Sequence, residues 1–432
     1  MIRWPRPGIR DLPAVALAVM LAIATVGCSA AGDRPRSPAD AKPEGTAAAP
    51  ETAASAADSA SAQKPAGSPV WIDALQMTSV TTGWALLWLS NPSRSSALAV
   101  ARTTDGGRTW TAVTPQPAVP ALGTGQALLE AATAQRAWFT VTGSSAGAQA
   151  TTTHVFGTAD GGRSWRESAA VGGTADPAAI DFAGPRRGWL LDSLGAAAGQ
   201  NPVALYRSAD GGLRWSLVAR SARMAGDAAT NSGLPVSCDK DGLAFATARI
   251  GWITGYCAVG ADVLASADGG AHWAAVSLPA LGQQCQNGCE IPAPELAGGR
   301  VFLLAGSYPA NADLLVSADA GQTWRVSPMP EGAGPYPRVR FFTADDGIAV
   351  AAGSQGRIGR FGYLTTNGGL TWTAVRLGRR FGGNWTDFDF VSLRAGFSWT
   401  DPGGGPVPAR LFRTTDSGRL WTSVVPRLSS QA

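Results

Sequence analysis

The sequence predicts an all-β fold, a seven-bladed β-propeller with four antiparallel strands in each blade. Two observations predict it: an octapeptide recurs seven times in nearly the same letters, and similar strand-like segments precede each copy. The acidic positions of successive copies are separated by 55, 50, 58, 51, 48 and 49 residues. A repeat of about 50 residues is typical of one supersecondary unit copied around an axis. The repeats place the propeller in residues 70–427 and leave 428–432 as a C-terminal tail.

Each octapeptide, which we call a turn box, has the chemistry of a tight turn that opens a strand. A serine or threonine begins it, and an aspartate two residues later is able to accept hydrogen bonds from the backbone N–H groups that follow. A Gly-Gly pair supplies positive φ angles, and a tryptophan begins the next strand and is expected to be buried between sheets. The acidic residues are therefore expected to be structural. They are Asp105, Asp160, Asp210, Asp268, Asp319, Asn367 and Asp416.

Three further strands precede each box. A β-like segment such as 203–207 lies directly before it, and a glycine–aromatic pair such as Gly188-Trp189 lies about 20 residues before the acidic position. The fifth unit departs from this pattern, with Arg300-Val301-Phe302 in the same place. Still earlier comes an alternating stretch such as 179–182. Each blade thus takes strands A to D from its own segment, and the ring is expected to close by packing between blades 1 and 7 alone.

Two segments precede the propeller. Residues 1–28 combine three arginines with an apolar run too short to span a bilayer but typical of a secretion signal. The TVGC segment resembles a bacterial lipobox, which implies a lipid on Cys28 and a location on the outer side of the cytoplasmic membrane. Ordinary signal cleavage just beyond Cys28 is the alternative. Residues 29–69 are rich in Ala, Ser and Pro and are expected to form a disordered tether.

Charge and cysteine usage narrow the class of protein. The formal net charge is +4, which does not support nucleic-acid binding. Besides Cys28 there are four cysteines, an even number in an exported protein. Propeller topology places them toward one face near blades 4 and 5 and favours the pairs Cys238–Cys257 and Cys285–Cys289. A zinc site is the alternative, although this spacing is not a usual zinc spacing.

The turn boxes resemble the Asp-box, or bacterial neuraminidase repeat. Together with the glycine–aromatic pairs, they are similar to the photosystem II stability/assembly factor family over roughly residues 70–427. The resemblance implies a propeller but does not fix a function, because sialidases, xyloglucan hydrolases and sortilin-type receptors carry the same box. The assembly factors also imply an arginine patch that binds an acidic or terminal segment of a client protein.

Evidence for catalysis is weak. The chain lacks the F-R-I-P segment of sialidases and has only five tyrosines. Asp387 and Asp389 share one side of a strand, and Glu290 and Glu295 are expected on loops; we interpret them as strand-end and solvated carboxylates rather than a glycosidase pair. The two histidines, at 154 and 272, belong to different blades, so neither a catalytic triad nor a histidine metal site is predicted. No catalytic residue, metal or cofactor is assigned.

The long, irregular connections, D–A and B–C, converge on the face opposite the boxes, and binding residues usually lie on such loops. Arginines gather there near blades 6 and 7 beside aromatic residues, a combination typical of protein interfaces. We therefore expect a monomeric, non-catalytic scaffold for a protein or cell-envelope partner; a carbohydrate-active propeller, either a glycosidase or a lectin, is the alternative. The predicted partner-binding residues are Arg338, Arg340, Arg357, Arg360, Arg379, Arg380 and Trp385.

Mass spectrometry of the mature protein tests the N-terminal interpretation. We expect the first residue to be Cys28 carrying lipid, and a Cys28→Ser variant should leave the membrane fraction because one covalent anchor has been lost. An unmodified N-terminus beyond Ala30 would show ordinary signal cleavage instead.

Overall fold

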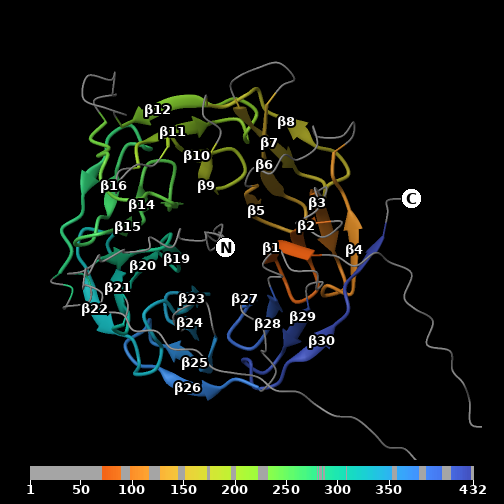
Figure 1. The fold of residues 1–432 in the computed structure, drawn as a ribbon, viewed down its shortest axis with the longest axis vertical. Coiled ribbons are helices and arrows are strands. Elements are labelled where there is room, and N and C mark those ends of the chain that lie inside the picture. Colours follow the sequence, from red (N-terminus) through yellow and green to blue (C-terminus); the bar gives the residue numbers. More distant parts are fainter. Residues whose placement is uncertain are drawn as a thin grey trace, which may run out of the picture. The chain divides into compact units, whose positions relative to one another are not determined.

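Seven four-stranded antiparallel sheets stand around a central axis, as the sequence predicted (Figure 1). The computed structural model describes residues 71–88, 98–115, 127–144, 151–172, 176–195, 201–221, 232–279, 281, 285, 288–307, 309–352, 358–378, 386–400 and 410–429. Each blade is built from consecutive strands of its own segment, with strand A at the axis and strand D at the rim. No helix in these ranges has the length and apolar character needed to cross a membrane.

In every blade the strands follow one another in chain order from the axis outward. Blade 1 contains β1 (Trp71–Met77), β2 (Gly83–Trp88), β3 (Leu98–Thr103) and β4 (Thr109–Ala112). Blade 2 contains β5 (Leu129–Ala131), β6 (Ala137–Ser144), β7 (Thr151–Thr158) and β8 (Arg166–Glu167). Blade 3 contains β9 (Pro177–Phe182), β10 (Gly188–Ser193), β11 (Val203–Ser208) and β12 (Ser216–Arg220). Blade 4 contains β13 (Gly242–Phe245), β14 (Gly251–Thr254), β16 (Leu264–Ser266) and β17 (Ala274–Ala275). Blade 5 contains β19 (Glu295–Ala297), β20 (Arg300–Ala305), β21 (Asp313–Ser317) and β22 (Arg325–Pro328). Blade 6 contains β23 (Arg338–Phe341), β24 (Asp346–Ala352), β25 (Ile358–Thr366) and β26 (Thr373–Arg376). Blade 7 contains β27 (Thr386–Phe390), β28 (Gly396–Thr400), β29 (Leu411–Thr414) and β30 (Thr422–Val424).

All seven turn boxes fold in the same way, with each acidic side chain bonded to its own turn. The acidic side chain accepts the backbone N–H four residues later, as in Leu420 N to Asp416 Oδ1 at 2.9 Å, and Asn367 does the same. The first hydroxyl of the box donates to that side chain and accepts the N–H of the second glycine position. Ala320 and Ser417 replace the first glycine and still adopt φ angles of 59° and 65°. The turn therefore depends mainly on this hydrogen-bonded network.

Neighbouring blades contact each other through stacked rings. Trp189 of blade 3 lies on Phe245 of blade 4, with centroids 3.7 Å apart and planes 3° apart, and Trp138 on Phe182 has nearly the same geometry. A Cβ on Gly251 would lie 2.4 Å from the Phe245 ring. The glycine of the glycine–aromatic pair therefore makes room for the strand A ring of its own blade, while the aromatic residue packs against the next blade.

The box tryptophans are less uniformly buried than expected. Trp110, Trp273 and Trp421 are buried, whereas the other four are partly exposed at the rim. Four keep the same local bond, in which the indole N–H donates to the carbonyl of the second glycine position, as in Trp110 to Gly107 at 3.0 Å. Trp165 instead donates to Val113 of blade 1.

The expectation that the ring closes by packing alone is wrong. A last strand, β31 (Arg427–Ser429), joins blade 1 as a fifth strand, parallel to β4 (Figure 1). The Arg427 N–H donates to Arg108 O at 3.0 Å, and the Ser429 hydroxyl donates to Trp110 O at 3.2 Å. Residues 428 and 429, expected in the tail, are thus part of the propeller. A short polar segment gave no period-two pattern that would have revealed this strand.

Replacing Trp110 by Ala should lower the free energy of unfolding by about 3–5 kcal/mol, because the ring is fully buried between blades 1 and 7. Urea denaturation followed by circular dichroism measures the change. Arg186→Ala is the control, since this side chain is exposed and should alter stability by less than about 0.5 kcal/mol. Equal effects of the two substitutions would contradict the packing of Trp110 between these blades.

Candidate functional site

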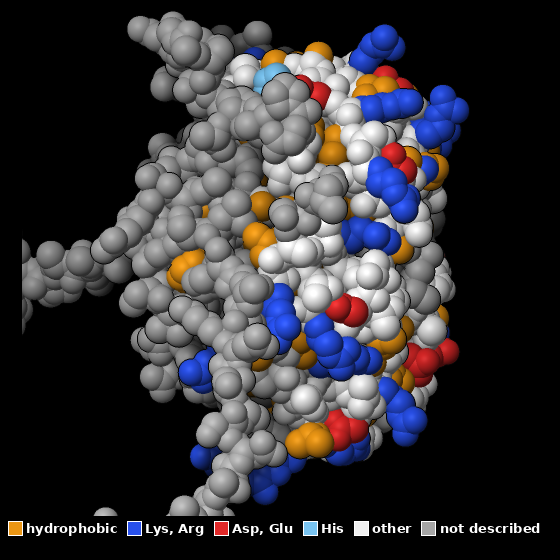
Figure 2. Space-filling model, turned by 90° about the vertical axis from the view of Figure 1, so that its right-hand side faces the viewer, with side chains coloured by type: hydrophobic (Ala, Val, Ile, Leu, Met, Phe, Trp, Pro, Cys, Tyr) orange, Lys and Arg blue, Asp and Glu red, His pale blue; other side chains and the backbone are white. Residues whose placement is uncertain are grey.

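The two faces of the ring carry different kinds of connection between strands. The A–B turns and the turn boxes lie on one side, which we call the box face, and the D–A and B–C connections lie on the other, the loop face. On the wall shown in Figure 2, basic side chains lie among acidic ones. Several box arginines are turned back on their own turns: Arg108, Arg163 and Arg419 donate to the carbonyl of the box aspartate at 3.0, 3.2 and 3.0 Å.

Blade 6 carries a different arrangement near the loop face. Arg360 and Arg376 are exposed, and neither forms an ion pair with another described residue. Phe361 is 44% exposed and lies directly opposite Arg376 on the neighbouring strand. The Leu377 N–H donates to Arg360 O at 2.9 Å, which extends the ladder to this end of the blade. A ring and two guanidinium groups are thus held at a strand edge.

Arg338 lies at the start of β23, on the loop-face side of the channel. Its Nε is 3.9 Å from Asp387 Oδ1 of blade 7, and both side chains are partly exposed. Glu290 is exposed, but its carboxyl has lost part of its hydration, and this loss raises its pKa. The nearby Asp241 adds to the rise, and Arg338 opposes it. We call Arg360, Phe361 and Arg376 the blade 6 arginine surface; Arg338 lies apart from it, on the innermost strand of the blade.

Arg340 and Glu295 are not on the loop face, contrary to expectation. The Arg340 guanidinium donates to both carboxylate oxygens of Glu295, at 3.1 and 3.2 Å, inside the ring. Arg340 borders a cavity of about 300 Å³ toward the box face and a second of about 90 Å³ toward the loop face. The two arginines lie on the same side of β23 and differ in depth: residue 338 begins the strand at its loop-face end, whereas residue 340 lies two residues further inside.

The pair belongs to a ring of residues that occupy the same register position in every blade. Each lies on strand A directly opposite the second residue of the glycine–aromatic pair, or of the segment that replaces it, and we call the set the channel ring. Asp181 of blade 3 accepts the Phe245 N–H of blade 4 at 3.0 Å, and Asp389 accepts the Met77 N–H of blade 1. The ring consists of Gln76, Glu130, Asp181, Ala244, Glu295, Arg340 and Asp389.

Glu130 is the exception within the channel ring. It is fully buried, and neither carboxylate oxygen has a hydrogen-bond partner in the described part of the chain. Burial raises its pKa well above the ordinary value; Asp181 adds to the rise, and Arg340 opposes it. Burial likewise raises the pKa of Asp181, against the hydrogen bonds from Phe245 and Phe182. Sequence reasoning missed this ring, although its members can be aligned one residue before each strand A aromatic position.

The cysteines pair as predicted, Cys238 with Cys257 and Cys285 with Cys289. A two-stranded ribbon of β15 (Tyr256–Cys257) and β18 (Cys289–Glu290) places Cys257 directly opposite Cys289. The sulfurs are therefore not thiolate ligands, even though an Asp262 oxygen lies near the first pair. The buried Lys240 donates to Cys238 O at 3.1 Å, and burial lowers its pKa to about 8 against Asp262 and Asp239.

The remaining predicted residues fall in two groups. Arg357, Arg379, Arg380 and Trp385, like Cys28, lie outside the described residues. Of the carboxylates considered for glycoside hydrolysis, Glu295 is paired with Arg340, and Asp389 accepts the Met77 N–H. The Phe388 N–H donates to Asp387 Oδ1 at 2.8 Å.

No protein-family model and no curated protein matches the chain. Solved structures similar to it include YCF48 bound to a D1 peptide, 14% identical over 83% of this chain and 93% of that chain, with a TM-score of 0.46. YCF48 from Cyanidioschyzon merolae is 16% identical over 84% and 97%, with a TM-score of 0.47. For the GH74 xyloglucanase from Xanthomonas campestris the identity is 16% and the TM-score 0.49, and the match covers 84% of this chain and 54% of the enzyme. These likenesses are too distant to transfer a function or a site residue.

Replacing Glu130 by Gln should raise the free energy of unfolding by about 1–3 kcal/mol near neutral pH, because a buried carboxylate without partners is replaced by a neutral amide. The raised pKa means that the folded protein holds this proton more tightly than the unfolded chain. The wild type therefore gains stability relative to the variant as the pH falls, and the difference should vanish below about pH 4.

Chemical denaturation at pH 4, 6 and 8 measures this difference. Glu331→Gln is the control, because Glu331 is exposed. A stability gain for Glu130→Gln that is the same at all three pH values would exclude desolvation of the charge as its cause.

Proposed function

We propose that this chain is a non-catalytic scaffold that binds a protein partner through the blade 6 arginine surface. The observation that supports the proposal is the exposed Phe361, set opposite Arg376 and directly after Arg360, on a rigid strand pair near the loop face. Aromatic residues and arginine are the residue types enriched in protein interfaces. Sites on strands also lose little conformational freedom on binding.

The chemistry of the surface favours an acidic partner segment with an apolar residue. A guanidinium group pairs with a carboxylate through two parallel N–H···O bonds, and unpaired arginines have this capacity available. Phe361 lies on the same side of the sheet as Arg376 and offers an apolar contact beside it. One of the YCF48 structures contains a D1 peptide, but the peptide-binding role proposed for this chain rests on blade 6 and not on that likeness.

We further propose that Cys28 anchors the propeller outside the cytoplasmic membrane, so that the partner is an exported or membrane protein. The basic and apolar N-terminal segment and its TVGC ending support this location. The paired cysteines of blades 4 and 5 agree with an oxidising compartment.

A carbohydrate-active propeller is the second candidate. The raised pKa of Glu290 favours it, because a glycosidase needs one carboxyl that stays protonated as the general acid. A panel of reporter glycosides, assayed with the soluble domain and with Glu290→Gln, decides the question. Turnover that the substitution abolishes would replace the scaffold proposal.

Charge reversal tests the binding surface. Arg360→Glu with Arg376→Glu should reduce partner capture in a pull-down from solubilised membranes at least tenfold and remove most of its salt sensitivity. Thermal stability should change little, since exposed charges contribute little to folding. The same reversal at Arg379 and Arg380 should act in the same direction.

The matched control is Arg186→Glu with Arg187→Glu, two exposed arginines in an A–B turn on the box face. Equal loss of partner in both double variants would show a general charge effect. Full recovery of the partner by the blade 6 variant would remove this surface from consideration.

A further inference from the structure

Stacked rings join three of the seven blade interfaces. At two others one ring is replaced by a long aliphatic side chain, Met77 of blade 1 or Ile348 of blade 6. The remaining two are the interfaces that precede blades 2 and 5. The strand A ring is replaced by Ala131 in blade 2 and by Leu296 in blade 5, at the same register position. The opposing residue also departs from glycine, as Ala137 and Val301. Trp84 of blade 1 and Trp252 of blade 4 therefore face blades that offer no ring on which to stack.

The gap opposite Trp84 is filled from within the chain. Trp165, a box tryptophan without the usual local bond, donates to Val113 O at 2.6 Å. Its ring meets Trp84 edge-on with centroids 6.0 Å apart, and it also contacts Phe139 at 5.0 Å. At this interface the chain supplies its own replacement ring.

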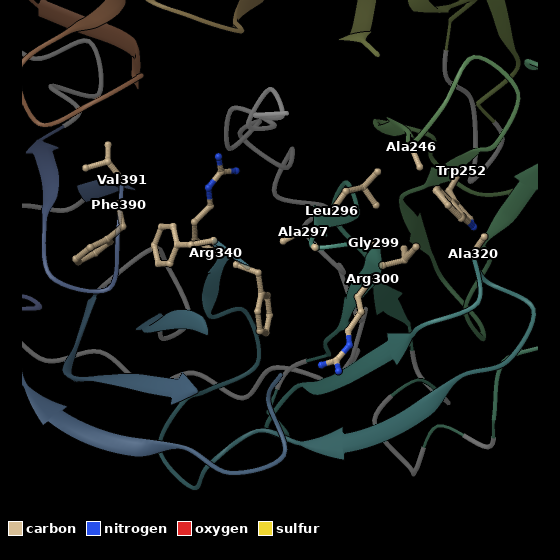
Figure 3. A pocket seen from close by; sticks show the side chains of 14 residues that line it. Ala246, Trp252, Leu296, Ala297, Gly299, Arg300, Ala320, Arg340, Phe390 and Val391 are labelled. Atoms are coloured by element: carbon tan, nitrogen blue, oxygen red, sulfur yellow. The ribbon is translucent and has the colours of Figure 1, made fainter. Parts of the chain in front are cut away.

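The gap opposite Trp252 is not filled in this way. Trp324, the box tryptophan of blade 5, keeps the usual bond to Gly321 O at 3.0 Å. The A–B turn of blade 5 is also one residue shorter than that of blade 6 and contains Gly298 and Gly299. The result is the cavity of about 300 Å³, which we call the blade 5 hollow (Figure 3). Its lining includes Trp252, Leu296, Val301, Arg340, Phe341 and Phe390.

Trp252 also lacks a hydrogen bond that its equivalents make. The indole N–H groups of Trp138 and Trp189 each donate to a box carbonyl of the next blade at 2.9 Å. The Trp252 Nε1 is buried and has no acceptor among the residues that the structure describes. An unsatisfied buried N–H is costly, so the interface is incomplete in both packing and hydrogen bonding.

We propose that the blade 5 hollow binds a neutral, planar aromatic small molecule of one or two fused rings. Such a ring would take the place beside Trp252 that a phenylalanine takes in blades 3 and 4. Aromatic walls favour offset or edge contacts with a further ring, and the volume suits a ligand of this size. Glu295 pairs with Arg340, and Asp345 pairs with Arg300 at 3.1 Å, so both described arginines that line the hollow already have a carboxylate partner. This site is on the box-face side and is independent of the proposed loop-face function.

The test is a ¹⁹F NMR titration of the full chain with 5-fluoroindole, with phenol as a competitor and cyclohexanol as a non-planar control. We expect saturable binding of 5-fluoroindole that phenol displaces and cyclohexanol does not. Leu296→Phe with Val301→Gly restores the ring and glycine of the other blades, and should weaken binding at least tenfold without lowering the melting temperature. Leu370→Phe adds the same ring on the exposed surface of blade 6 and should leave binding unchanged.

A second variant keeps the test decisive if the double substitution does not fold. A Cβ on Gly299 would meet nothing within 4 Å, so Gly299→Asn adds a side chain at the hollow without a steric clash. The Gly299 φ of +81° disfavours most side chains, and asparagine is among those that tolerate it best. This substitution should also weaken binding. No saturable binding by the wild type, or equal binding by a folded ring-restoring variant, would overturn the proposal.

Discussion

The packing of one aromatic ring against the next blade is the contact on which the propeller depends. In blades 3, 4 and 6 a phenylalanine on strand A is covered by a ring of the preceding blade at 3.6–3.7 Å. The glycine opposite that phenylalanine leaves no Cβ in the way, and its aromatic neighbour reaches onward to the following blade. A local rule within one unit thus sets the spacing and angle between units. This explains why the glycine–aromatic pair, which has no catalytic chemistry, is repeated so regularly.

The channel ring joins the same blades by polar contacts. Asp181, Gln76 and Asp389 each accept a backbone N–H of the next blade, and Glu295 meets Arg340. Glu130 is longer than Asp181 by one methylene and has no such partner. Glu130 therefore keeps a buried carboxyl without a hydrogen bond from the described residues, and burial raises its pKa. Packing fixes how the blades meet, whereas the polar contacts fix their register near the axis.

The fold was predictable because its signals are local. Asp210, Gly211 and Gly212 close a turn whose bonds lie within eight residues, and each repeat shows the signal again. The disulfides followed from topology once the blades were placed. The channel ring and β31 were not predicted, because both depend on contacts between distant segments: Met77 with Asp389, and Arg427 with Arg108. Arg338 and Arg340 show the same limit, since only the curvature of the ring decides that one is near the mouth and the other is paired inside.

The place of β31 has a mechanical consequence. The first and last described strands, β1 and β31, belong to the same blade, at its inner and outer edges. A force that separates the two ends therefore acts first on blade 1. The pairing of the three-residue strand β31 with β4 is the shortest contact that resists it. The disulfides close segments of 19 and 4 residues in the D–A and B–C region of blades 4 and 5, so they do not reinforce this seam. Under tension the ring should open at blade 1 while the cross-linked blades stay folded.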